Sequence, residues 1–83
     1  MIAGIGPKSN EMLAKAGINT REQLLRVGSV KAHLMVKAAG ANPSLNFLWG
    51  LESVITGQHW QYVAKHSRTA LLMELKERSQ TDR

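Results

Sequence analysis

Glycines that recur along the chain are the sequence feature that most limits its fold. Gly17, Gly28, Gly40 and Gly57 each follow a short run of helix-forming residues. A glycine just after such a run favours a left-handed stop, so each run is expected to be a short helix followed by a tight turn. Almost no stretch shows the alternation of apolar and polar residues that is typical of a strand. We therefore predict an all-α fold, a compact bundle of about five short helices.

The expected helices follow from capping residues and apolar periodicity. They are about Pro7–Ala16; about Arg21–Val27, with a capping box of Thr20 and Gln23; a third from a Ser29 cap to Gly40; a fourth that starts at Asn42-Pro43 and ends at Gly57; and a last one after a Ser67 cap, with residues 79–83 as a fraying polar tail. An irregular link with one turn of helix is expected over residues 58–66. Apolar residues surround most of the fourth helix, which is therefore expected to be the most buried.

The 83 residues leave room for one domain with one small core, so a large enclosed active-site cleft is not expected. The chain has no cysteine. This excludes disulfide scaffolds and cysteine nucleophiles, and it favours a reducing, cytoplasmic compartment. No run approaches the ~18 to 20 apolar residues of a membrane span, and no export signal is visible.

The net charge of +5 is unevenly distributed. Residues 1–40 hold six of the basic and two of the acidic residues, whereas residues 41–83 hold five and four. A basic first half is consistent with an anionic partner. A generic solvated surface is the alternative interpretation.

The most informative motif is Gly4-Ile5-Gly6-Pro7-Lys8-Ser9, which opens the first expected helix. Two glycines around one apolar residue allow a sharp turn that buries Ile5 and leaves the N–H groups of the first helical turn unpaired. With Lys8 beside them, these donors are expected to hold a phosphate oxygen without reading a base. The motif resembles the hairpin of the helix-hairpin-helix family, whose first helix would precede Gly4. We therefore expect the chain to be a fragment of a longer protein; a purely structural turn is the alternative.

A second, weaker copy of this turn is expected over residues 24–31, where a short helix, Gly28 and a new helix follow in the same order. Val30 stands where the second glycine would be, which favours a supporting role for this copy. Lys8 and Lys15 are seven residues apart and so share one helix face. The candidate nucleic-acid contacts are Gly4, Ile5, Gly6, Lys8, Ser9, Lys15 and Lys31.

No motif for catalysis or metal binding is found in the sequence. His33, His59 and His66 lack the spacing of a ligand set, so no catalytic residue, metal or cofactor is expected. Trp49 and Trp60 are expected in the core, because one lies in the most apolar helix and the other follows its terminating glycine. Stacking of these rings against bases is the alternative.

The chain also resembles the C-terminal domain of the TfoX/Sxy family of bacterial competence regulators, in segments that read GIGPKSNEML, AGINTREQLLRVGSVKAHL, NPSLNFLWGLESVITGQHW and RTALLMEL. The most specific part is residues 45–52, followed by Gly57, His59 and Trp60. Tyr62-Val63 stands where the family often has Leu-Pro. The resemblance implies a separate N-terminal α/β domain in the full-length protein, no known catalytic residues, and a role with the catabolite activator protein in expressing DNA-uptake genes.

Two functional hypotheses follow. The first is a non-enzymatic regulatory domain that binds DNA phosphates weakly and without sequence preference. The second is a protein-interaction module that docks the catabolite activator protein or its own N-terminal domain through an exposed apolar face of the fourth helix and through Met12, Met35 and Met73. Self-association through the same face is a third possibility.

Overall fold

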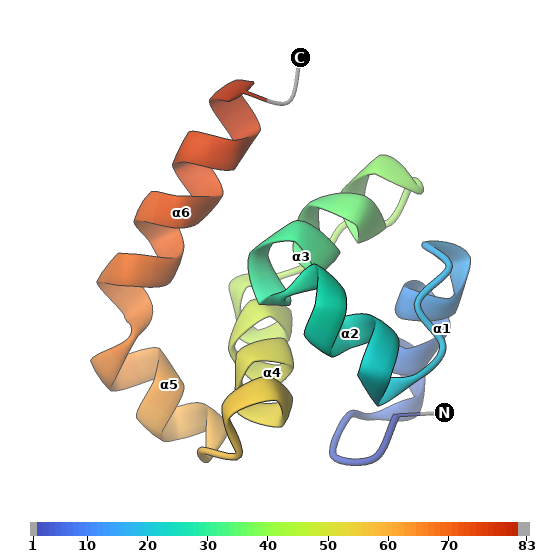
Figure 1. The fold of residues 1–83 in the computed structure, drawn as a ribbon, viewed down its shortest axis with the longest axis horizontal. Coiled ribbons are helices and arrows are strands. Elements are labelled where there is room, and N and C mark those ends of the chain that lie inside the picture. Colours follow the sequence, from blue (N-terminus) through green and yellow to red (C-terminus); the bar gives the residue numbers. More distant parts are fainter. Residues whose placement is uncertain (1, 82–83) are drawn as a thin grey trace.

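The computed structural model describes residues 2–81, with side chains described as far as Ser79, and these residues form helices and no strand (Figure 1). The helices are α1 (Pro7–Lys15), α2 (Arg21–Val27), α3 (Ser29–Ala38), α4 (Leu45–Thr56), α5 (Trp60–His66) and α6 (Arg68–Thr81). The predicted all-α class is therefore confirmed. The helix beyond the five expected is α5, which forms where an irregular link was predicted. Helix α6 continues to Thr81, through residues that were expected to fray.

The start of α2 agrees with the prediction, since Thr20 and Gln23 form a reciprocal capping box. Two other predicted helix starts are wrong. Ser29 is the first residue of α3 rather than its cap, and Gly28 occupies the N-cap position. Helix α4 begins at Leu45, because the hydroxyl of Ser44 caps it by accepting a hydrogen bond from the amide of Phe47 (3.3 Å).

The core consists of two clusters of buried apolar side chains, and α4 contributes to both. Phe47 and Leu51 belong to the cluster that covers α1, α2 and part of α3, whereas Leu48 and Trp49 belong to the cluster beneath α5 and α6. The remaining members are Ile2, Leu13, Ile18, Leu24, Ala32 and Val36 in the first and Val30, Val63 and Leu71 in the second. The expectation that the fourth helix is the most buried is wrong, because α3 also contributes to both clusters and has five buried residues of ten, against four of twelve in α4.

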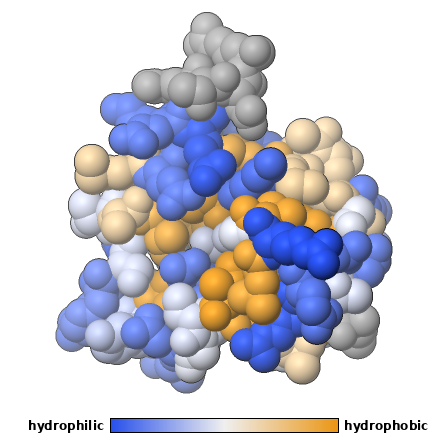
Figure 2. All heavy atoms as spheres, in the orientation of Figure 1, coloured by the Kyte–Doolittle hydropathy of each residue, from blue (hydrophilic) through white to orange (hydrophobic). Residues whose placement is uncertain are grey.

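The outer helices lie on opposite sides of α4, with α1 at one edge of the molecule and α6 at the other (Figure 1). Helix α6 packs against α3 and α5. Hydrophobic side chains reach the surface among hydrophilic ones on the face shown in Figure 2. No helix within residues 2–81 is long and apolar enough to cross a membrane.

The two tryptophans occupy different environments. Trp49 is buried, as predicted, whereas Trp60 is 44% exposed and the prediction of core packing is wrong for it. The reason is that α5 is a helix whose inward position is taken by the buried Val63, so its first residue lies at the side of the bundle. Trp60 instead lines a groove, described below.

Candidate functional site

The first glycine turn is held together by the side chain of Asn10. The amide of Ile2 donates to Asn10 Oδ1 (2.7 Å), and Asn10 Nδ2 lies within hydrogen-bond distance of the carbonyl oxygens of Ile2, Ile5 and Gly6 (3.0–3.2 Å). Asn10 itself is buried. The carboxamide therefore binds the carbonyl side of the turn, and it leaves the amides of the first helical turn to other partners.

The amides that were expected to be free have no acceptor in the described part of the chain. Gly6 is the N-cap of α1 and offers no side chain, and the amides of Gly6, Lys8 and Ser9 make no hydrogen bond within residues 2–81. Gly6 and Lys8 are exposed and Ser9 is half-buried. These amides form the positive end of a nine-residue helix, which is an environment that favours an anion.

The two glycines of the turn have different roles, which corrects the expectation that both are needed for its sharp bend. Gly4 has a φ of +87°, a left-handed conformation that favours glycine. Gly6 has a φ of −67° and a ψ of 164°, values that any residue adopts, and nothing lies within 4 Å of a Cβ added there. Because Gly6 has no side chain, the N-terminus of α1 stays uncapped and open. Ile5 packs, partly buried, against the first core cluster.

Helix α1 carries two lysines, Lys8 in its first turn and Lys15 at its last residue. Lys8 and Lys15 are exposed, and neither forms an ion pair within the residues that the structure describes. Seven residues of helix separate them by about 10 Å along the axis. The structure thus brings Gly4–Ser9 together as one turn, and Lys15 extends it along the same helix face.

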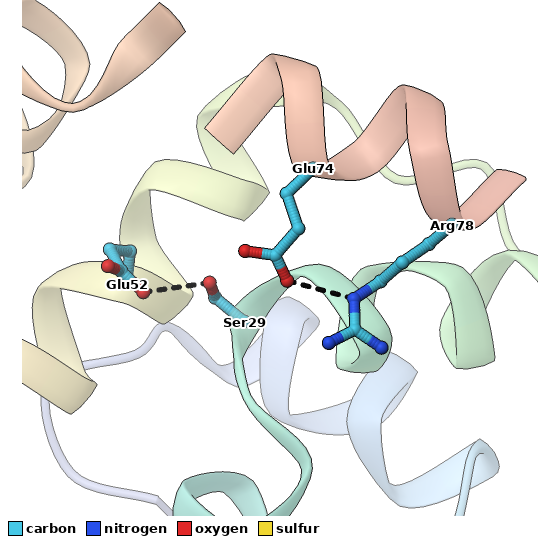
Figure 3. A network of polar contacts seen from close by, with 4 residues as sticks. All are labelled: Ser29, Glu52, Glu74 and Arg78. Carbon is cyan, nitrogen blue, oxygen red and sulfur yellow. Dashed lines mark hydrogen bonds and ion pairs between the residues drawn. The ribbon is translucent and has the colours of Figure 1, made fainter. Parts of the chain in front are cut away.

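The second turn differs from the first because its helix start holds one of the chain's own carboxylates. Ser29 Oγ donates to Glu52 Oε1 (2.8 Å), so α4 delivers a negative charge to the first residue of α3 (Figure 3). Figure 3 also shows the exposed Glu74–Arg78 pair within α6 (2.8 Å). Lys31 is exposed on α3, in a different turn from Lys8. A phosphate at the second turn would meet Glu52, which repels it.

A groove of about 450 Å³ runs beside the first turn. The turn and Met12 form one part of its lining, the N-cap and exposed side of α4 form another, and Trp60 contributes an aromatic ring. Its apolar lining includes Phe47 and Leu51, whereas Ser44 and Ser53 are polar. Lys8 is the charged residue in this lining, and no acidic residue takes part. The groove therefore suits a ligand with an apolar part and a negative charge.

Gly50 lies in the middle of α4 and lines the same groove. Its backbone is helical, without a positive φ, and nothing lies within 4 Å of a Cβ added there. A glycine inside a helix costs about 1 kcal/mol relative to alanine. Neither conformation nor packing requires it, and its effect is to keep the groove open over α4.

His33 is a buried histidine that does not line this groove. Neither ring nitrogen has a hydrogen-bond partner, and its ring lies 6.1 Å from that of Phe47. Burial lowers the pKa of His33 below 6.5, and the positive charge of Lys37 lowers it further. The backbone near Ser44 and Pro43 partly offsets this decrease, although it forms no hydrogen bond with either ring nitrogen. His33 is therefore neutral in the folded protein at pH 7. Within the described residues no group of three His, Cys, Asp or Glu is placed to hold a metal.

Sequence reasoning missed three residues that shape these sites: Asn10, Gly50 and Glu52. The signal for Asn10 was a poor helix former inside a predicted helix, four residues after the turn, where a side chain reaches back to the backbone. The signal for Gly50 was a glycine within the most apolar helix. Glu52 gave no signal, because its partner Ser29 is 23 residues away in sequence.

These features define a class of protein: a small all-α domain in which glycine turns open short helices without a side-chain cap, one turn exposed and the other with a carboxylate hydrogen-bonded to the hydroxyl of its first helical residue. Residues 2–75 match the family model described as the TfoX C-terminal domain. The chain belongs to this family, and the resemblance seen in its sequence is confirmed. No curated protein and no solved structure matches the chain.

Proposed function

We propose that this chain is a non-enzymatic, DNA-contacting domain of a regulator of competence gene expression, and that the Gly4–Ser9 turn binds a phosphate of the DNA backbone. The observation that carries the proposal is the uncapped start of α1, where the amides of Gly6, Lys8 and Ser9 have no acceptor in the described chain. Lys8 and Lys15 add positive charge on the same helix. The connection with competence rests on the family alone.

The affinity should be weak and independent of sequence. A phosphate contact without base contacts gives a Kd of about 10⁻⁴ to 10⁻⁶ M at physiological salt, and this affinity falls as salt rises. The contrast between the two turns supports a single contact, since Glu52 repels phosphate at the second turn. Lys31 lies in the first turn of α3, where Glu52 is hydrogen-bonded to Ser29, and it is therefore proposed only as a secondary contact.

Fluorescence anisotropy with a labelled duplex tests this proposal. Gly6→Val combined with Lys8→Glu should abolish binding at low salt, because it covers the amides and reverses the nearby charge. Lys76→Glu, an exposed position on α6, is the charge-matched control for Lys8→Glu and should bind much as the unmodified chain does. The proposal is rejected if the unmodified chain does not bind, or if the double variant binds as well as the control.

A second candidate function is the docking of a protein, either the catabolite activator protein or the N-terminal domain of the same regulator. It draws support from the exposed apolar side chains of Trp60, Tyr62 and Met73. On the fourth helix, Leu45 is 40% exposed, whereas Phe47, Leu48, Trp49 and Leu51 are buried. Met12 and Met35 also pack against the core. Capture of either protein without DNA present would support docking, and failure to capture both would count against it.

A further inference from the structure

We propose that the groove beside the first turn takes an unpaired nucleobase, so that the domain prefers single-stranded to double-stranded nucleic acid. This inference rests on the proposed function, since the phosphate of the same nucleotide would lie at the Gly4–Ser9 turn. The form of nucleic acid that the site would recognise is a single strand.

Trp60 is the residue on which a base would stack. Its ring lines the groove and is 44% exposed, although a tryptophan of a small domain usually serves in the core, as the buried Trp49 does. An accessible tryptophan ring beside a positively charged backbone site is the usual platform on which a base stacks. His59 stacks against the same indole, with ring centroids 5.9 Å apart, and so helps to hold it in place.

The space for a base comes from Gly50. This residue leaves the middle of α4 without a side chain on the groove side, at a cost in helix stability that nothing in the local geometry requires. The groove volume of about 450 Å³ lies within the range of small-molecule sites. A paired base is enclosed in its stack and cannot enter such a groove, whereas an unpaired base can.

The remaining lining fits a nucleotide better than a peptide side chain. The hydroxyl groups of Ser44 and Ser53 and the amide of Asn46 offer uncharged donors and acceptors of the kind that pair with base edges. Lys8 is the charged group of the lining and complements a phosphate. A nucleotide has a flat ring, a polar ring edge and a negative charge, which match the indole, the uncharged polar groups and the lysine of this lining.

The test compares the binding of a labelled oligothymidine and of a duplex with the same number of phosphates. We expect tighter binding of the oligothymidine at equal salt. Trp60→Ala should weaken that binding about 5-fold or more, because base–aromatic stacking is lost. Trp60→Phe should restore part of it, and duplex binding should change little in either variant. Tyr62→Ala is the matched control, since Tyr62 is as exposed (47%) but lies outside the groove lining.

Gly50→Leu provides an independent variant that fills the groove. Leucine is a better helix former than glycine, so this variant should melt no lower than the unmodified chain while it loses the preference for single strands. The inference is overturned if the two nucleic acids bind equally, if the preference survives Trp60→Ala, or if an acidic peptide carrying phenylalanine displaces the oligothymidine at equal concentration. Failure of the proposed function would look different, because duplex binding would then be absent or insensitive to Lys8→Glu.

Discussion

Asn10 has the largest structural role of any single polar residue in the first turn. Its buried carboxamide replaces the hydrogen bonds that the backbone of residues 2–6 would otherwise make with water. Buried polar groups that lose a partner cost about 1 to 3 kcal/mol each. The conformation that exposes the amides of Gly6, Lys8 and Ser9 therefore depends on the side chain of Asn10, which bonds to none of these three amides.

Asn10→Ala should lower the free energy of unfolding by about 2 to 3 kcal/mol, because the Ile2 amide and several carbonyl groups lose their partner. Urea unfolding followed by circular dichroism measures this change. Asn42→Ala is the control, since Asn42 is exposed and should stay within about 0.5 kcal/mol of the unmodified chain. Equal effects of the two substitutions would show that the carboxamide does not hold the turn.

Gly6→Asp should separate the stability of the domain from its binding of DNA. Aspartate is a strong N-cap, so its carboxylate should bond the free amides, and stability should be unchanged or slightly higher. The same carboxylate repels phosphate, and duplex affinity should fall roughly tenfold, since a hydrogen bond to a charged group contributes about 1.5 kcal/mol. Gly6→Ala adds no cap and should retain most of the affinity. Loss of affinity in both variants, or in neither, would contradict this account.

His33 should make the domain less stable in mild acid. The pKa of His33 is lowered in the folded state from its ordinary value of 6.5, so below pH 6.5 the unfolded chain takes up a proton that the folded chain resists. Stability present above that pH is therefore lost as the pH falls. Urea midpoints at pH 7.5 and 5.5 should differ less for His33→Leu than for the unmodified chain. His66→Gln, at an exposed position, should keep the full difference.

At the scale of elements, the two glycine turns share an order of residues but differ in their physical requirements. Gly28 has a φ of 87° and a ψ of 158°, a region that is open essentially to glycine alone. Gly6 has an extended backbone conformation that any residue can adopt. The second turn therefore needs Gly28 to form and the first needs Gly4, which has the same φ of +87°, whereas a glycine at Gly6 serves only to keep the helix end open.

Gly28→Ala should consequently destabilise the domain by about 1 to 3 kcal/mol, since alanine is strained at this φ and ψ. Gly6→Ala should change stability by less than about 1 kcal/mol, because its conformation suits any residue. Thermal unfolding of the two variants side by side measures the difference. Similar melting temperatures would contradict the expectation that the positive φ of Gly28 strains an alanine there.

Helices whose ends carry strong local signals could be predicted from the sequence, and the others could not. The capping box of Thr20 and Gln23 fixed the start of α2, and Gly57 fixed the end of α4. Helix α5 was missed because it is capped by the ring of His59, whose Nδ1 accepts from the amide of Gln61 (3.1 Å), and histidine is not a usual cap. A seven-residue helix is also too short to show a periodic apolar face.

At the scale of the whole molecule, the candidate site joins segments that are distant in sequence. The turn at residues 4–9 could be recognised because its residues are consecutive, but its neighbours Gly50 and Trp60 come from α4 and α5 and meet it only in the folded bundle. Glu52 of α4 reaches the hydroxyl of Ser29 at the second turn through the same packing. Local patterns hold no information on such contacts, so the sequence predicted the turn but not the groove beside it.

The charges that distinguish the two turns come from different halves of the chain. The basic first half carries the open turn, and α4 in the second half supplies the carboxylate that lies beside the other turn. A duplex approaching this domain should therefore be drawn to one end of α1 rather than to both helix starts. We therefore expect the first turn, and not the second, to bind DNA phosphate.

Amide chemical shifts of the ¹⁵N-labelled domain during a titration with duplex DNA at low salt test that claim most directly. The amides of Gly6, Lys8 and Ser9 should move progressively and return as salt is added, whereas those of Ser29 and Val30 at the second turn should stay in place. Shifts that centre on the second turn, or shifts that leave Gly6, Lys8 and Ser9 unmoved, would contradict the account.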